Sequence, residues 1–262
     1  MGTSANYGGP PNWGPVKASV TRAAQQGHLT QQKAATIMSN FVSAMSDSPR
    51  GGFVAGGGGG GGHSGGGGAG GGRGGRKSSS RSRGVHGIAA SVGSFLSDVK
   101  ERGLRDALRG LGIGNIDDTE PESLVLILAD VLGGSGSTID EVDLRTALCE
   151  LLRELTKDLQ DINQVETALR TAAANLEQVI RDLFGHYIFE RFNTTNCANL
   201  DAKGGVAKTD SFLGEIKRFI DTQLRLEGTR RELTSVNWRG TEGKSIVEEI
   251  LQQTIAVFTG EE

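Results

Sequence analysis

Residues 51–85 read GGFVAGGGGGGGHSGGGGAGGGRGGRKSSSRSRGV, and this run decides which parts of the chain can fold. Glycine has no side chain to bury and the most backbone freedom to lose, so ordering such a run costs about 1–2 kcal/mol per residue. We therefore predict a disordered, glycine-rich and basic linker over 51–85. It separates a flexible N-terminal tail at 1–15 and a helical arm at 16–50 from an α-helical domain at 86–262.

The part before the linker changes character near residue 17. Residues 1–15, MGTSANYGGPPNWGP, mix glycine and proline with single aromatic residues, which excludes helix and shows no strand alternation. From Lys17 the chain becomes helical, with an interruption at Gly27 and His28. Apolar residues then recur at helical spacing at Ala34, Ile37, Met38, Phe41, Val42 and Met45. A helix this short is marginal alone, so we expect it to pack on the body or on another protein.

The part after the linker is helical almost throughout. Amphipathic stripes run from Ile88 and from Leu104. The segment SLVLILADVL at 123–132 is apolar on nearly every face, which predicts a central, buried helix. Capping boxes at 119–122 and 138–141 mark two helix starts, and the second helix should carry Val142 on its inner side.

The C-terminal half continues the helical pattern. The apolar spacing over about 163–192 predicts two packed antiparallel helices. The polar stretch NTTNCANLDAKGG at 193–205 predicts a break before a helix that carries Phe212, and a loop through Trp238 precedes the last helix. The predicted fold class is all-α, a bundle of six or seven helices in the body.

Charge and cysteine content narrow the possible functions. The chain has 28 basic and 31 acidic residues, yet six basic residues lie in or beside the linker without an acid among them, so the remainder carries a formal charge of about −9. Two cysteines without a CxxC pair indicate a reducing cytoplasm. No apolar run reaches the ~18 residues that span a bilayer, and the N-terminus lacks the charged-then-apolar layout of a signal peptide. We therefore expect a cytoplasmic protein without membrane contact.

The basic residues of the linker have two interpretations. Arginine in a glycine-rich setting binds single-stranded nucleic acid, although stacking also needs aromatic residues and the linker offers only Phe53. Weak, salt-sensitive contact is one interpretation. The other is that the charges keep the linker soluble or dock on the acidic body. The candidate contact residues are Arg73, Arg76, Lys77, Arg81 and Arg83.

No catalytic or metal-binding pattern stands out, so we predict a protein that is not an enzyme and has no cofactor. The stretch from Lys203 to Thr209 fits the phosphate-loop variant KGGxxK[ST]. Gly243-Lys244-Ser245 matches only the end of the ordinary phosphate-loop pattern, whose first glycine would fall at Trp238. Neither follows an apolar strand, so both indicate ordinary helix N-termini. A nucleotide hydrolase that uses Lys208 and Thr209 is the weakest interpretation. His186 and Cys149 fit a helical core, and Glu190 and Arg191 fit a solvated face.

The N-terminus carries a further candidate site. Met1 is normally removed before a small residue, which exposes Gly2 as an unhindered amine on a glycine-rich tail. An α-amine has a pKa of about 7.7–8.0, so roughly a tenth of it is neutral and nucleophilic at pH 7. The myristoylation pattern requires serine or threonine at position 6, where this chain has Asn6. Such an end is suited to being a substrate.

Several stretches together resemble the QatB family of the four-gene Qat antiphage defence operons of bacteria. They are MGTSANYGGP at 1–10, GGRGGRKSSSRSR at 71–83, SVGSFLSDVKERGLRDALRGLGI at 91–113, TIDEVDLRTALCELLREL at 138–155, IFERF at 188–192 and WRGTEG at 238–243. The resemblance implies a subunit that works with a QueC-like enzyme (QatC), an ATPase (QatA) and a TatD-like nuclease (QatD).

The resemblance also implies a role for Gly2. QueC chemistry activates a 7-deazaguanine carboxylate with ATP and couples it to an amine, so we hypothesise a deazaguanine amide at Gly2. The linker would let the tail enter the enzyme while the body is bound elsewhere. The tail residues recognised would be Thr3, Ser4, Tyr7, Gly8, Gly9 and Pro10. The alternative function is a nucleic-acid-binding module that acts through the basic linker.

Overall fold

A computed structural model describes residues 13–27, 29–46, 84–114, 116, 119–134, 139–226, 233 and 236–260. These residues form ten helices and no strand, which confirms the all-α class. Residues 84–260 hold eight of the helices, one more than the upper expectation. The ten are α1 (Trp13–Gln25), α2 (Gln31–Ser46), α3 (Val85–Arg102), α4 (Leu104–Gly110), α5 (Pro121–Gly133), α6 (Ile139–Leu155), α7 (Ile162–Ala174), α8 (Leu176–Gly204), α9 (Val206–Leu226) and α10 (Thr241–Thr259).

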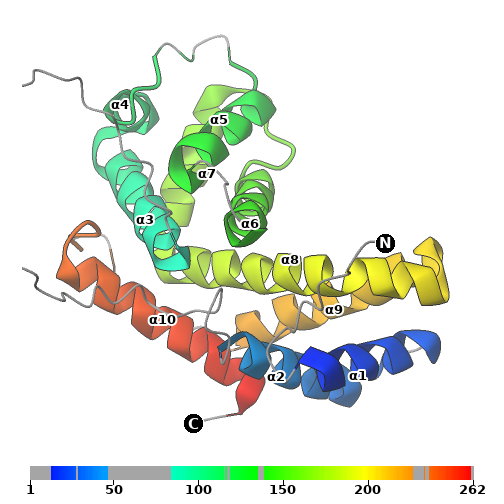
Figure 1. Cartoon of the computed structure of the whole chain (residues 1–262). Coiled ribbons are helices and arrows are strands. Elements are labelled where there is room, and N and C mark those ends of the chain that lie inside the picture. Colours follow the sequence, from blue (N-terminus) through cyan, green and yellow to red (C-terminus); the bar gives the residue numbers. More distant parts are fainter. Residues whose placement is uncertain are drawn as a thin grey trace, which may run out of the picture.

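Helix α8 is the longest of these helices, and the others are arranged on its two sides (Figure 1). Helices α3 to α7 lie on one side, while α1, α2, α9 and α10 lie on the other. Almost every residue from Val179 to Ile188 is therefore buried. A helix that is apolar around most of its circumference needs such a central position.

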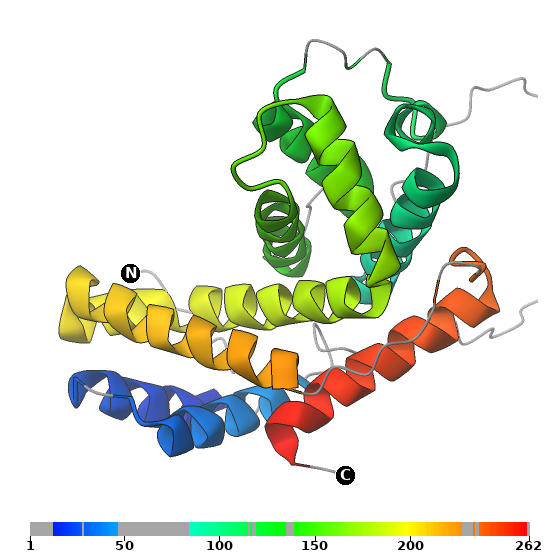
Figure 2. The same cartoon turned by 180° about the vertical axis from the view of Figure 1, so that it is seen from behind.

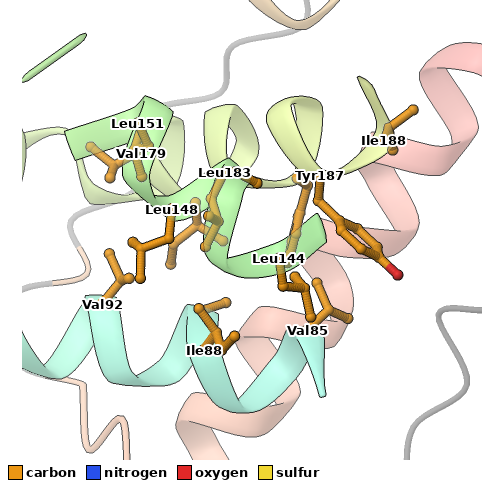
Figure 3. Close-up of a cluster of buried hydrophobic side chains, with 14 of the residues drawn as sticks. Val85, Ile88, Val92, Leu144, Leu148, Leu151, Val179, Leu183, Tyr187 and Ile188 are labelled. Atoms are coloured by element: carbon orange, nitrogen blue, oxygen red, sulfur yellow. The ribbon is translucent and has the colours of Figure 1, made fainter. Parts of the chain in front are cut away.

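The first side is held to α8 by an apolar cluster from three helices (Figure 3). Ile88 and Val92 of α3, Leu144 and Leu148 of α6, and Leu183 of α8 are each at most 2% exposed. These residues recur three or four positions apart on each helix, so each helix presents one apolar stripe to the cluster. The cluster fixes α3 and α6 on the same side of α8.

The second side includes the helical arm. Figure 2 shows α9 alongside α8, with α1 and α2 beyond it. The Trp13 ring meets the Phe41 ring edge-on with centroids 5.2 Å apart, and Phe41 meets Phe192 of α8 at 5.0 Å. Thr21 accepts a hydrogen bond from Asn199 of α8 at 2.8 Å. Of the two docking possibilities that the sequence left open, the structure has the arm on the body.

Helix α1 begins earlier than the sequence indicates. The helix starts at Trp13 rather than near Lys17, so the expectation of an irregular tail up to residue 15 is wrong for residues 13–15. Pro15 lies in the first turn, where backbone N–H groups have no helical acceptor and a proline removes nothing. The packing of Trp13 on Phe41 offsets the poor helix propensity of Gly14 and Pro15.

The polar stretch 193–205 is not a break. Helix α8 runs through it to Gly204 and ends where Gly205 adopts a φ of 77°. Asn196 is buried and donates from its side chain to the Phe192 carbonyl at 2.9 Å, and Leu200 is buried on the same face. The expected pair of packed antiparallel helices over 163–192 is also wrong. Helix α7 ends at Ala174 and packs mainly on α3, whereas α8 packs mainly on α6 and α9.

Helix α5 is peripheral rather than central. Its inner face is buried at Leu124, Leu128 and Leu132, but Leu126 is 51% and Ile127 36% exposed. Its N-cap is Glu120, with Pro121 as the first helical residue and no side-chain capping bond, so the expected threonine cap is wrong. Val142 of α6, expected inside, is 51% exposed. The expected cap at Thr138 lies outside the described residues.

Candidate functional site

The site residues expected from the sequence lie outside the described residues. This holds for Gly2 and the tail residues Thr3, Ser4, Tyr7, Gly8, Gly9 and Pro10, and for the basic residues Arg73, Arg76, Lys77, Arg81 and Arg83. The structure fixes the points at which these segments join the folded part, which are Trp13 and Gly84.

The docked arm changes how far the tail can reach. Because α1 and α2 pack on α8, α9 and α10, the segment between Ser46 and Gly84 joins two parts of one folded unit. Its length therefore does not set the reach of Gly2. That reach depends on the eleven residues from Gly2 to Asn12, which span at most about 40 Å when fully extended.

A recess of about 780 Å³ lies between α3, α10 and the C-terminal ends of α4 and α5. It brings together two of the stretches that carry the resemblance, 91–113 and 238–243. Helix α3 contributes a row of small or polar side chains, and α10 contributes Lys244 and Glu248. The remaining lining is mainly apolar and comes from Leu111, Val131, Leu132 and Trp238.

Trp238 holds the two stretches together. The side chain is 3% exposed, and its Nε1–H donates to the Ser97 hydroxyl of α3 at 3.0 Å. The ring lies over Gly93, where a Cβ would come within 2.5 Å of it, and a Cβ at Gly243 would come equally close to the Trp238 Cα. Both glycines are thus required by close packing. The sequence placed Trp238 in a loop and missed this contact, whose only signal was a glycine in each neighbouring helix.

Charged groups surround the recess. His86 Nε2 lies 2.5 Å from the Glu248 carboxylate, which links the start of α3 to α10. Asp98 pairs with Arg102 one turn along α3 at 2.6 Å. Arg239 and Lys244 are exposed at the start of α10. The recess therefore combines an apolar floor with charges of both signs at its rim, the usual composition of a site for a polar ligand or peptide.

The stretch from Lys203 to Thr209 spans the end of α8 and the start of α9, so only its second half is a helix N-terminus, whereas Gly243–Ser245 lies at the N-terminus of α10. Lys203 is in the last turn of α8, Gly205 joins α8 to α9, and the Thr209 hydroxyl donates to the Gly205 carbonyl at 3.2 Å. Gly243 and Lys244 lie in the first turns of α10, directly after Trp238. No strand precedes either one among the described residues.

The cysteines and the central histidine have structural surroundings. Cys149 and Cys197 are half-buried free thiols, and burial raises the pKa of each. A raised pKa leaves less of the nucleophilic thiolate at neutral pH. His186 is 5% exposed, with Nε2 3.3 Å from the Glu154 carboxylate. His186 is thus a core residue, one of the two positions expected for it, while Cys149, expected as a core filler, is only partly buried at the edge of the core.

Arg191 is not on a solvated face. Its Nη1 lies 2.7 Å from the Asp140 carboxylate and 3.1 Å from that of Asp143, both on α6. Thr194 also donates to Asp143 at 2.7 Å. Burial raises the pKa of Asp140, and the Arg191 guanidinium opposes that rise. Glu190 is half-buried as well, and burial raises its pKa. The expectation is wrong because α6 packs directly over this part of α8.

One family of known proteins matches the chain over residues 72–258, from just before α3 to the end of α10. That family is described as the Qat anti-phage system associated protein QatB. The chain belongs to the QatB family. No curated protein and no solved structure matches it. Membership gives the protein a role in Qat antiphage defence, with other Qat proteins as partners.

Two properties of the described residues concern membrane-spanning helices and groups of metal-binding side chains. None of their helices combines the length and the apolar character needed to cross a bilayer. In the same residues, histidine, cysteine and carboxylate side chains do not gather into any group of three suited to a metal ion.

Proposed function

We propose that the protein is a non-catalytic subunit of the Qat system whose helical domain binds other Qat proteins and whose Gly2 amine is the substrate of the QueC-like enzyme. The observation that carries the proposal is the family match over 72–258. The match supports a role in the Qat system. The resemblance implies that the QueC-like member of this system would activate a carboxylate for attack by an amine.

In the proposed reaction, this chain supplies only its N-terminal amine, and ATP and the 7-deazaguanine carboxylate supply the rest. ATP converts the 7-deazaguanine carboxylate into an acyl adenylate and releases pyrophosphate. The neutral Gly2 amine attacks the acyl carbon, AMP leaves, and the amine loses a proton as the amide forms. A primary amine without a side chain at its α-carbon meets little steric hindrance in this step.

The docked arm supports this role by limiting where the enzyme must bind. Trp13 is held against Phe41 of α2, which packs on Phe192 of α8, and a fully extended tail would let Gly2 reach at most about 40 Å from Trp13. The active site of the partner must therefore lie within that distance of the start of α1. We expect the partner to contact the second side of the fold, where α1 and α2 lie.

The test is an intact-mass measurement of the full chain after co-expression with the QueC-like enzyme and with the complete set of Qat proteins. The expected result is a mass increase that corresponds to one deazaguanine acyl group, located by fragmentation at the N-terminal glycine. An unmodified N-terminus in a set of proteins that still protects cells from phage would overturn the proposal.

Two variants sharpen that test. Gly2→Ala keeps an unhindered primary amine and should still be modified. Gly2→Pro presents a hindered secondary amine and should lose the mass increase together with protection. Modification of both variants to the same extent would show that the acceptor lies elsewhere in the chain.

A further inference from the structure

The outer surface of α5 and α6 carries an ordered pattern of charge around an apolar centre. Arg153 Nη2 of α6 lies 2.9 Å from the Glu122 carboxylate of α5, and Arg145 Nη2 lies 2.8 Å from that of Asp130. The two pairs are two turns apart on each helix and run in opposite directions, so the helices are antiparallel in a defined register. We call this surface the α5–α6 face; it comprises Glu122, Leu126, Asp130, Val142, Arg145, Cys149 and Arg153.

The register places an apolar pair between the two ion pairs. Leu126 lies midway between Glu122 and Asp130, and Cys149 lies midway between Arg145 and Arg153. Cys149 is half-buried and packs against the core beneath this surface, and burial raises the pKa of its thiol. Leu126 and Val142 are each 51% exposed at this face. A helix as apolar as α5 is normally covered on all sides, so the face calls for a partner.

We propose that a second copy of this chain covers the face. In a pair whose twofold axis runs along the seam between α5 and α6, each α5 packs on the α6 of the other copy. Glu122 then faces Arg153 and Asp130 faces Arg145 across the interface, while Leu126 faces Cys149. The two copies form a four-helix arrangement in which every corner charge meets its opposite.

The charge pattern favours this twofold axis over the perpendicular one, and a second copy of the chain over a partner of uniform charge. A twofold axis perpendicular to the seam would place Glu122 against Asp130 and Arg145 against Arg153, so that like charges meet at all four corners. A partner with a surface of one sign would meet two like charges as well. Glu150 adds one acid beside Arg153, at 3.1 Å, without changing the four corners.

The shape of the face agrees with this arrangement. In the same register, Val142 of one copy comes over Gly133 and Gly134 of the other. Neither glycine has a side chain that would meet the valine. Helix α6 has 17 residues, about 25 Å, so two adjacent helices offer a footprint of roughly 500 Å². That is at the low end for specific interfaces, and we expect a dimer that depends on protein concentration.

Complementary charge reversal in the full chain tests the pairing. Glu122→Arg with Asp130→Arg makes the α5 corners basic, and Arg145→Glu with Arg153→Glu makes the α6 corners acidic. Each double variant alone should be monomeric by analytical ultracentrifugation, because like charges then meet across the interface. An equimolar mixture of the two should form a mixed dimer, because the four basic corners of one variant then meet the four acidic corners of the other.

Further measurements guard against loss of folding. The uncharged variant Leu126→Ser with Val142→Ser changes only half-exposed side chains and should weaken the dimer by roughly tenfold or more in Kd. Val206→Ser, 64% exposed on α9 beyond α8, is the matched control and should leave Kd unchanged. Far-ultraviolet circular dichroism confirms that each variant is folded. A monomeric natural chain at high concentration, or a mixture that stays monomeric, would overturn the proposal. The dimer does not depend on the Gly2 chemistry.

Discussion

Helices α2 and α5 both carry apolar residues at the edge of the fold, yet the fold covers those of α2 and leaves part of those of α5 exposed. In α2, Ile37, Met38, Phe41, Val42 and Met45 are all at most 4% exposed. In α5, Leu126 and Ile127 remain 51% and 36% exposed while the inner face is closed. The apolar stripe of α2 is as wide as the surface that receives it, whereas α5 has apolar residues beyond the stripe that its own fold can cover.

The difference separates two kinds of edge. The α2 edge belongs to the core that the chain completes by itself, because Phe41 lies between Trp13 and Phe192. The α5 edge is complete only on one face, and its surplus apolar residues have no role in the isolated fold. We expect substitutions at the first edge to change stability and those at the outer face of the second to change association.

The largest effect should come from Phe41→Ala. The side chain is fully buried between two aromatic rings, so its removal costs its transfer free energy and leaves a cavity. We expect a loss of about 3–5 kcal/mol in the free energy of unfolding, measured by urea denaturation. Thr36→Ala, exposed on the same helix, is the control and should change it by less than about 0.5 kcal/mol. A loss below about 1 kcal/mol for Phe41→Ala would show that α2 is not part of the core.

An intermediate effect should distinguish the two faces of α5. Leu128 is 1% exposed on the inner face, and Leu128→Ala should cost about 2–4 kcal/mol. Leu126→Ala, on the outer face two residues earlier, should cost less than about 0.5 kcal/mol in dilute solution. Urea denaturation of both variants at the same low concentration makes the comparison. Equal losses would mean that α5 is covered on both faces within one copy.

The smallest effect should come from Asp182 of α8, through the pH dependence of the free energy of unfolding. Burial raises the pKa of Asp182 on α8, so the folded state holds this proton more tightly than the unfolded chain does. The associated stability is present below the unfolded pKa of about 3.9 and is lost as the pH rises through the folded pKa. Asp182→Asn removes that loss and can keep the hydrogen bond that Gln178 donates at 2.8 Å.

The free energy of unfolding of Asp182→Asn should therefore rise relative to that of the natural chain as the pH rises. The gain should be smaller than the losses expected for Phe41→Ala and Leu128→Ala. Urea denaturation from pH 3.5 to pH 7.5 measures the difference. His186, Glu154 and Arg225 also act on Asp182, and they are unchanged in the variant. A difference that is constant with pH, or that shrinks as the pH rises, would contradict the assignment.

Helical spacing was sufficient to predict the class of the fold and the buried stripe of α2. Spacing failed where the environment of a segment decides its state. The polar residues around Asn196 stay helical because side chains bond to carbonyls one turn earlier and because α1 and α9 pack on this end of α8. The all-round apolar character of α5 predicts a central position only if the same chain must cover every face of the helix, and Leu126 and Ile127 remain exposed.

The candidate site was less accessible to sequence reasoning than the fold. Trp238 and Ser97 are 141 residues apart in the chain, and no local pattern announces a hydrogen bond between them. Gly93 and Gly243 gave a faint signal, because a glycine inside a helical pattern often marks close packing. The expected amine at Gly2 and the basic residues from Arg73 to Arg83 lie outside the described residues and stay predictions.

The docking of the arm has one more consequence. Ser46 and Gly84 both belong to elements that are packed on the same core, so a protease cut anywhere between them severs a single covalent link and none of the contacts described above. The two fragments would remain associated and would be released from each other only by denaturation. In this molecule the glycine-rich run is thus a place where the polypeptide can be opened, rearranged or extended by insertion without dismantling the helices around it.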